Sequence, residues 1–240
     1  MSATLHDVSA AVLAGGLGTR LRAAVPDRPK VLAPVAGRPF LAHLLDRLAR
    51  ASVREVVLLT GHAADQVHAA FGDRYAGMRL TYSAEQAPLG TAGAVRHALP
   101  LLRSETVLLM NGDSYCDADL AAFRRSHAEE PSGFGMVLAR VADASRYGRV
   151  EVAADGRVVR FAEKEPAGPP GWINAGIYLF PRALLEGLEP TRAASLERDL
   201  LPAWVAADRV RGFRAEGRFI DIGTPESYAA AEAFFHAAAA

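Results

Sequence analysis

The first half of the chain alternates short apolar runs with stretches of helical periodicity. The apolar runs predict strands over Val8–Ala14, Glu55–Thr60, Met78–Tyr82 and Thr106–Met110. The helical patterns between them predict helices over Phe40–Ala51, Ala64–Phe71 and Thr91–Leu99. Strands that alternate with helices in this way are typical of a doubly wound α/β fold built on a mostly parallel sheet.

The pattern changes after residue 132, where strands follow one another directly. We expect these strands over Gly133–Val141, Arg149–Ala153 and Val158–Ala162, with a hairpin turn at Asp155-Gly156. The sheet is therefore expected to be mixed, with a small antiparallel insertion. No internal repeat or flexible linker divides the chain. We expect one domain over residues 1–240, whose halves, about 1–132 and 133–240, share one sheet, with a helix from Tyr228 towards Ala240.

Composition narrows the class of partner. The chain has 27 Lys and Arg residues and 27 Asp and Glu residues, so it lacks the net positive charge that non-specific binding to nucleic acid or to an anionic membrane requires. No stretch approaches the roughly 20 apolar residues of a membrane span, and the single cysteine, Cys116, cannot form an internal disulfide. We expect a cytoplasmic protein that binds a small molecule.

The loop after the first predicted strand is rich in glycine. Gly15, Gly16 and Gly18 let backbone amides approach an anion closely, and Arg20 adds a guanidinium that matches phosphate geometry. A tight strand-to-helix turn would explain the glycines equally well. However, four prolines keep the chain irregular as far as Phe40, and so long a loop is usually functional. The P-loop and the dinucleotide-binding motif both require residues that are missing here.

The whole segment, LAGGLGTRLRAAVPDRPKVLAPVAGRPF, resembles the signature of the sugar nucleotidyltransferases. The resemblance implies a Rossmann-like domain in which the loop, an arginine and a lysine hold a nucleoside triphosphate. The positions that match this role are Leu13, Ala14, Gly15, Gly16, Gly18, Thr19, Arg20 and Lys30. Covalent catalysis has no evident carrier, because neither Cys116 nor any serine lies in a nucleophile motif.

A second segment, EQAPLGTA, matches the base-reading loop of the family at Glu85, Pro88, Gly90 and Thr91. A carboxylate only accepts hydrogen bonds, so Glu85 suits the adjacent N–H and NH₂ donors of guanine. This favours GTP, although the single imide donor of uracil or thymine would also satisfy Glu85. Gly90-Thr91 is also a good start for the following helix.

Two aspartates match the family's magnesium ligands. Asp113 follows an apolar strand, at the strand end where open α/β sheets bind ligands. Asp221 lies between two isoleucines, a costly position for an unpaired carboxylate. Together they would supply the hard oxygen ligands that Mg²⁺ prefers. An ordinary turn after the strand is an alternative explanation of Asp113.

The remaining matches concern the sugar and its phosphate. By resemblance, sugar hydroxyls would be bound at Asn111, Gly148, Glu163 and Asn174, and the sugar phosphate by Lys164. Arg20, Lys30, Asp113 and Lys164 are then the catalytic set. Taken singly, Glu163-Lys164 is also typical of a solvated strand end, and Asn174-Ala175-Gly176 of a turn.

The predicted reaction transfers a nucleoside monophosphate, GMP by preference, from the triphosphate to a sugar 1-phosphate. Within the family, the short length and the runs PLGTAG and SLERDLLP are most similar to D-glycero-D-manno-heptose 1-phosphate guanylyltransferases. The alternatives are transferases for N-acetylmuramate, mannose or glucose 1-phosphate, a cytidylyltransferase for a non-sugar phosphate, and a non-catalytic nucleotide-sugar sensor. A homodimer is the default expectation for a soluble enzyme.

Overall fold

The computed structural model describes residues 4–16, 18, 20–21, 24–61, 63–130, 133–162 and 169–236. Its strands are β1 Ser9–Leu13, β2 Pro34–Val35, β3 Arg38–Pro39, β4 Glu55–Thr60, β5 Arg74–Tyr75, β6 Met78–Ala84, β7 Thr106–Asn111, β8 Ser114–Cys116, β9 Phe134–Val141, β10 Arg149–Val152, β11 Val158–Ala162, β12 Gly171–Pro181, β13 Val210–Arg214 and β14 Phe219–Asp221. The α-helices are α1 Phe40–Arg50, α2 Ala64–Phe71, α3 Gly90–Ala98, α4 Leu120–Glu129, α5 Ala183–Glu186, α6 Leu201–Ala206 and α7 Pro225–His236. Three short helices of other types are η1 Lys30–Leu32, η2 Leu99–Leu101 and η3 Leu196–Leu200.

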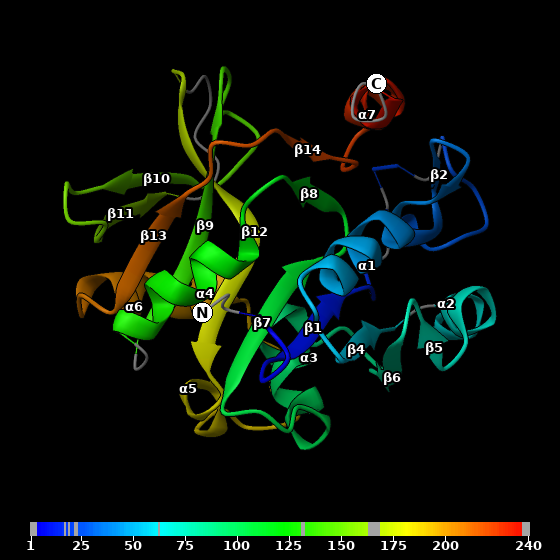
Figure 1. Cartoon of the computed structure of the whole chain (residues 1–240), viewed down its shortest axis with the longest axis horizontal. Coiled ribbons are helices and arrows are strands. Elements are labelled where there is room, and N and C mark those ends of the chain that lie inside the picture. The colour runs from blue at the N-terminus through cyan, green and yellow to red at the C-terminus, as the bar shows by residue number, and fades with distance from the viewer. Residues whose placement is uncertain are drawn as a thin grey trace.

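A 10-stranded mixed sheet runs through the molecule in the order β11-β10-β12-β7-β1-β4-β6-β5, with β9 beside β12 and β13 beside β9 (Figure 1). Strands β7, β1, β4 and β6 are parallel to one another. In this block Leu13 of β1 lies level with Leu59 of β4 and Asn111 of β7. The loops that follow these strands therefore open at one edge, as the alternating pattern predicted.

Strand β12 joins the two halves of the chain. It pairs antiparallel with β7 of the first half and with β9 and β10 of the second. The predicted hairpin is confirmed, since β10 and β11 are antiparallel and Gly156 adopts φ +87° in their turn. The two halves share one sheet, as expected.

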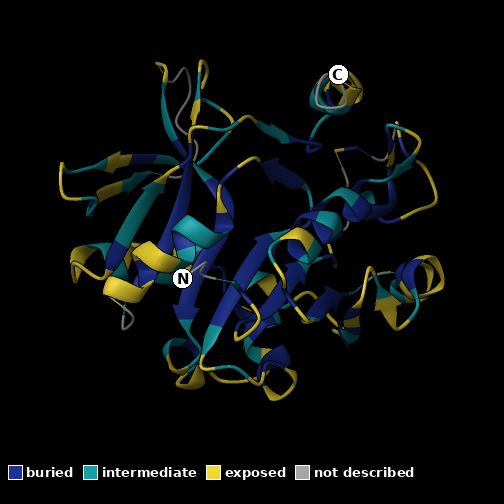
Figure 2. Cartoon of the chain, viewed as in Figure 1, coloured by how far each residue is buried: buried dark blue, intermediate teal, exposed yellow. Residues whose placement is uncertain are grey.

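Helices cover both faces of the sheet. Residues of α1, α2, α4 and α7 pack on one face, against alternate strand residues such as Ala10, Val12 and Leu58. Helices α3, α5 and α6 pack on the other face, against the intervening residues such as Ala11 and Leu59. Figure 2 shows the central strands buried and the outward sides of the surrounding helices exposed. The burial of both strand faces explains why their sequences are apolar runs without alternation.

Several elements were not predicted. Strands β8 and β14 form a separate two-stranded sheet, with Asp221 opposite Ser114, and β13 pairs in parallel with β9. These strands are short and depend on partners about 75 to 110 residues away in the chain, which local periodicity does not reveal. Helix α7 begins at Pro225, three residues before the predicted start at Tyr228, and lies beside β2 and α1 (Figure 1). No helix among the described residues is long and apolar enough to span a bilayer.

Candidate active site

The glycine-rich loop leaves β1 at the edge where the parallel strands end. A side chain would be crowded at Gly15, where a Cβ would lie 3.0 Å from the amide nitrogen of Gly61. Gly16 has open space around it, and Gly18 adopts φ +57° against the Lys30 side chain. The loop therefore turns bare backbone towards solvent beside a lysine, as an anion-binding loop requires. Thr19 lies outside the described residues.

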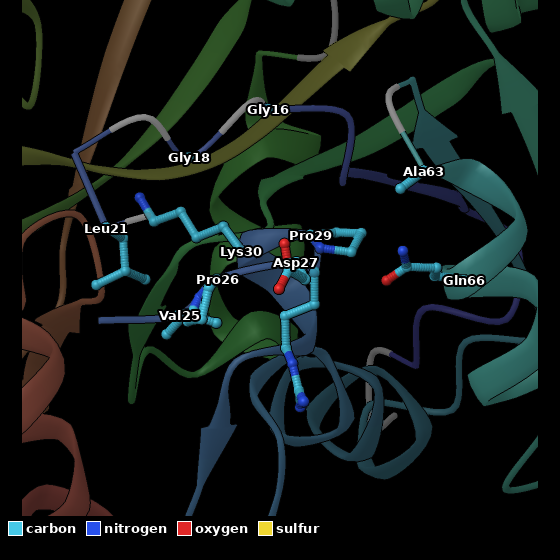
Figure 3. A pocket seen from close by; sticks show the side chains of 11 residues that line it. Gly16, Gly18, Leu21, Val25, Pro26, Asp27, Pro29, Lys30, Ala63 and Gln66 are labelled. Atoms are coloured by element: carbon cyan, nitrogen blue, oxygen red, sulfur yellow. The ribbon is translucent and has the colours of Figure 1, made fainter. Parts of the chain in front are cut away.

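Two cavities meet at this loop. A cavity of about 670 Å³, here called the nucleotide cavity, is lined by residues from the ends of β1, β4, β6 and β7: Leu13, Gly15, Gly16, Gly18, Lys30, Val31, Leu59, Gly61, Glu85, Gln86, Ala87, Pro88, Gly90, Thr91, Ala94, Asn111, Gly112 and Asp113. A second cavity of about 560 Å³ shares Gly16, Gly18 and Lys30 with it. In Figure 3 this second cavity lies between the loop, Pro29 and Gln66 of α2. The loop is thus open on two sides.

Glu85 lies in the wall of the nucleotide cavity. Its Oε2 accepts a hydrogen bond from the Leu89 amide at 3.1 Å. Its Oε1 lies so close to Gly61 that a Cβ there would be 3.1 Å away. Burial raises the pKa of this carboxyl, and the Leu89 amide partly offsets that effect. The carboxylate of Glu85 is therefore fixed in the cavity wall, where the sequence predicted a hydrogen-bond acceptor.

The other predicted residues of this segment have different surroundings. Pro88, Gly90 and Thr91 line the cavity, and Gly90 must be glycine because it adopts φ +71° with Ala194 packed against it. Thr91 uses its hydroxyl within the protein: it donates to Glu197 at 2.7 Å and accepts from the Leu196 amide at 2.8 Å. The hydroxyl of Thr91 thus ties α3 to η3.

The two predicted metal ligands come together. Asp113 and Asp221 line one cavity of about 200 Å³, here called the acceptor cavity, whose lining residues are Arg20, Asn111, Asp113, Ser114, Arg146, Tyr147, Gly148, Phe161, Asn174, Glu197, Phe219, Asp221 and Gly223. The pairing of β14 with β8 brings them together, and the Ile222 amide donates to the carbonyl oxygen of Asp113 at 2.9 Å. Asp113 and Asn111 also line the nucleotide cavity, so the two cavities adjoin.

Each aspartate is paired with a cation. Lys30 Nζ donates to Asp113 Oδ2 at 2.7 Å. Arg146 Nη2 donates to Asp221 Oδ1 and Oδ2 at 3.1 and 3.2 Å. Asp221 also accepts from the Gly223 amide at 2.6 Å, from Ser227 Oγ at 3.2 Å and from the Tyr147 hydroxyl. Burial, and then the bond to Asp221, raise the pKa of Tyr147, so this phenol stays neutral.

This donor set fits a hard divalent cation. Two carboxylates share one cavity, and the side chain of Asp113 is 42% exposed. Among the described residues, no third histidine, cysteine or acidic side chain joins them in a metal-binding group. A cation held by Asp113 and Asp221 would complete its shell with water and substrate oxygens, which is how Mg²⁺ is usually bound.

The acceptor cavity also carries neutral polar groups. Asn174 donates to the Tyr178 hydroxyl at 2.7 Å, and that hydroxyl donates to Glu197 Oε1 at 3.2 Å. Asn111 lines both cavities, and its Oδ1 is buried without a hydrogen-bond partner among the described residues. A Cβ on Gly148 would lie 2.8 Å from the ring of Phe161. Glu163 and Lys164 lie outside the described residues.

Of the other residues predicted for the nucleotide, Leu13 and Lys30 line the nucleotide cavity, Arg20 lines the acceptor cavity instead, and Ala14 is buried and lines neither. Sequence reasoning also missed three residues. Arg146, Tyr147 and Glu197 all line the acceptor cavity. A signal was available, because Arg146 and Tyr147 directly precede Gly148, and Glu197 lies in the SLERDLLP run. Nothing local indicated that these side chains point towards residues 19 to 106 positions away.

Known proteins are similar to this chain in sequence and in fold. The chain is 38% identical to the mannose-1-phosphate guanylyltransferase of Mycobacterium tuberculosis over 226 residues, which is 93% of this chain and 63% of that protein. It is 35% identical to the D-glycero-alpha-D-manno-heptose 1-phosphate guanylyltransferase of Aneurinibacillus thermoaerophilus, over 94% of this chain and 97% of that protein. The chain thus spans less than two thirds of the mycobacterial relative and nearly all of the other.

Among solved structures, HddC from Yersinia pseudotuberculosis complexed with GMP-PN superposes with a TM-score of 0.84 at 30% identity, covering 95% of this chain and 99% of that one. Residues 9–238 match the family described as nucleotidyl transferase. The resemblance inferred from the sequence is confirmed, and the chain belongs to the nucleotidyl transferase family.

Proposed function

We propose that this protein transfers GMP from GTP to D-glycero-α-D-manno-heptose 1-phosphate, giving GDP-heptose and pyrophosphate. The observation that carries the proposal is the meeting of Asp113 and Asp221 in one cavity that adjoins the nucleotide cavity. A sensor that binds without turnover would not need two carboxylates at the junction of two ligand cavities. The heptose and guanine specificities are supported by relatives whose sequences match this chain over nearly their full length.

The acceptor needs no general base. The second ionisation of a phosphate monoester lies near about pH 6, so the sugar phosphate is largely a dianion at neutral pH. One of its oxygens attacks the α-phosphorus of GTP, a new P–O bond forms, and the bond to the β-phosphate oxygen breaks as pyrophosphate leaves. The protein's work is then to position the two substrates and to neutralise charge.

The residues divide this work. The amides of Gly15, Gly16 and Gly18, together with Arg20, hold the triphosphate tail, and Lys164 holds the attacking phosphate. Lys30 neutralises charge at the α-phosphoryl group, a role consistent with its present position on Asp113. Mg²⁺ bound by Asp113 and Asp221 would neutralise further negative charge on the phosphates.

Glu85 is the base reader in this proposal. Leu89 holds one carboxylate oxygen and leaves the other to accept from N–H donors of guanine. At the other end, Asn111 and Asn174 line the acceptor cavity and supply polar groups for the sugar hydroxyls. Mannose 1-phosphate is the second candidate acceptor, because the mycobacterial relative is a mannose-1-phosphate guanylyltransferase.

A pyrophosphate-release assay with Mg²⁺ tests both substrates together. GTP, UTP and dTTP are each combined with the 1-phosphates of heptose, mannose, glucose and N-acetylmuramic acid. We expect the highest kcat/KM for GTP with the heptose. A clear preference for UTP or dTTP would refute the base assignment, and a preference for mannose would select the second candidate. The homodimer and the cytoplasmic location stay predictions.

A further inference from the structure

Arg146 is a charged side chain in the acceptor cavity that contacts Asp221, one of the two predicted metal ligands. Its guanidinium carbon lies 5.5 Å from the centroid of the Tyr147 ring. Its Nη2 contacts both oxygens of Asp221 and also Ser227 Oγ at 3.3 Å. Within the described part of the chain, all its hydrogen bonds run through Nη2, and 40% of its side chain is exposed. Its other N–H donors therefore remain available to a ligand.

The negative charges of the acceptor cavity explain why the guanidinium of Arg146 lies there. Asp221 has only 11% of its side chain exposed and lies in the same cavity as Asp113. Two negative charges in one cavity repel each other unless positive charge lies nearby. Lys30 compensates Asp113, and Arg146 compensates Asp221. A divalent cation would bind the same carboxylate oxygens, so it must compete with these internal cations.

We propose that Arg146 is an internal counter-ion that orients Asp221 before Mg²⁺ binds, is displaced from it by the metal, and then binds the phosphate of the sugar 1-phosphate. The inference rests on the proposed function, because it needs Asp221 to hold the metal. The displaced guanidinium stays in the acceptor cavity, where the dianionic phosphate is the complementary partner. Its planar fork of N–H donors matches phosphate oxygens.

Two other contacts of Asp221 provide a contrast. Tyr147 and Ser227 also donate to the carboxylate, but neither carries a charge. Removing the Tyr147 hydroxyl takes away one hydrogen bond and no competing cation. Arg146→Gln, in contrast, removes the competing charge and retains an amide donor. Only the arginine variant should make metal binding tighter.

Calorimetric titration of Mg²⁺ into the free enzyme tests the first step. For Arg146→Gln we expect a Kd about 30-fold lower than that of the wild type, the effect of removing one unit charge about 4 Å from a divalent cation in a water-like dielectric. Tyr147→Phe should bind Mg²⁺ no more tightly than the wild type. Arg157→Gln, which loses exposed pairs with Asp155 and Asp208 outside the cavity, should leave the Kd unchanged.

Binding of the sugar 1-phosphate in the presence of Mg²⁺ tests the second step. We expect about tenfold weaker binding for Arg146→Gln, the loss of a charge-assisted contact. Arg146→Lys keeps the charge without the fork, and it should bind Mg²⁺ like the wild type but the sugar phosphate more weakly. This second variant keeps the test decisive if the first fails to fold.

The outcomes separate this inference from the proposed function. If Asp221→Asn loses Mg²⁺ binding while Arg146→Gln binds the metal no more tightly than the wild type, the role of Arg146 is refuted and the metal site stands. If Asp113→Asn and Asp221→Asn both bind Mg²⁺ as the wild type does, the metal site itself is refuted, and the inference with it.

Discussion

The nucleotide cavity and the acceptor cavity are built in different ways. Much of the nucleotide cavity is backbone. Glycines lie at the ends of the parallel strands, where a side chain at Gly112 would collide with the main chain of Leu13 and one at Gly15 would be crowded by Gly61. The acceptor cavity is built from side chains that hold one another, such as Arg146 on Asp221 and Asn174 on Tyr178. A cavity of backbone suits the phosphates that all donors share, whereas a network of side chains can be varied to suit one sugar.

The junction of the two cavities should be the most sensitive point. Asp113→Asn removes a charge that faces both, and we expect turnover to fall by about 10²- to 10³-fold. Pyrophosphate release at saturating GTP and sugar phosphate measures the loss. Asp117→Asn is the matched control, because Asp117 pairs with Arg218 away from both cavities. Turnover of the Asp113 variant within tenfold of the wild type would contradict the role given to this residue.

Lys30 belongs to the same junction and should have the next largest effect. Lys30→Ala removes a side chain that is 10% exposed and bonded to Asp113. We expect kcat to fall by about 10²-fold with a smaller change in either KM, because the contact is needed mainly in the transition state. Steady-state kinetics with both substrates varied provides the test. Near-normal turnover would exclude Lys30 from the chemistry.

Glu85 tests how the nucleotide cavity selects its base. Glu85→Gln converts a pure acceptor into a group that also donates, so the ratio of kcat/KM for GTP over UTP should fall by about tenfold. Competition between the two nucleotides measures this ratio. Glu55→Gln is the control. Glu55 lies at the start of β4, at the end away from the nucleotide cavity, and pairs with Arg79, so this variant should keep the wild-type ratio. An unchanged ratio in the Glu85 variant would show that another residue reads the base.

Tyr178 tests the side-chain network of the acceptor cavity, where we expect the smallest effect. Burial keeps the pKa of its hydroxyl well above the usual range, so it donates to Glu197 and accepts from Asn174. Tyr178→Phe should lower the free energy of unfolding by about 1–2 kcal/mol. It should also raise KM for the sugar phosphate about threefold without changing KM for GTP.

Urea denaturation and initial-rate kinetics measure the two effects of Tyr178→Phe. Tyr75→Phe loses a hydrogen bond to Asp46 outside both cavities, so it controls for the loss of a tyrosine hydroxyl. Equal increases in the KM values of GTP and sugar phosphate would show that the network supports the whole site and not the acceptor cavity alone.

The sequence by itself determined the parallel half of the fold and most of the nucleotide cavity. Apolar runs and helical patterns predicted β1, β4, β6 and β7 and the helices between them to within about two residues. The glycine-rich loop and Glu85 follow these strands directly, and strand ends in a parallel sheet meet at one edge. Position in the chain was therefore enough to place them together.

Only the tertiary structure decided how the acceptor cavity is assembled. The pairing of β14 with β8 brings Asp221 beside Asp113, and Arg146, 75 residues before Asp221, provides its counter-charge. Thr91, which was predicted to bind nucleotide, lines the nucleotide cavity, and its hydroxyl is bonded to Glu197, 106 residues away. Hydrogen bonds and ion pairs depend on distance in space, which no local sequence pattern encodes. The partners of these residues could therefore be identified only from the folded structure.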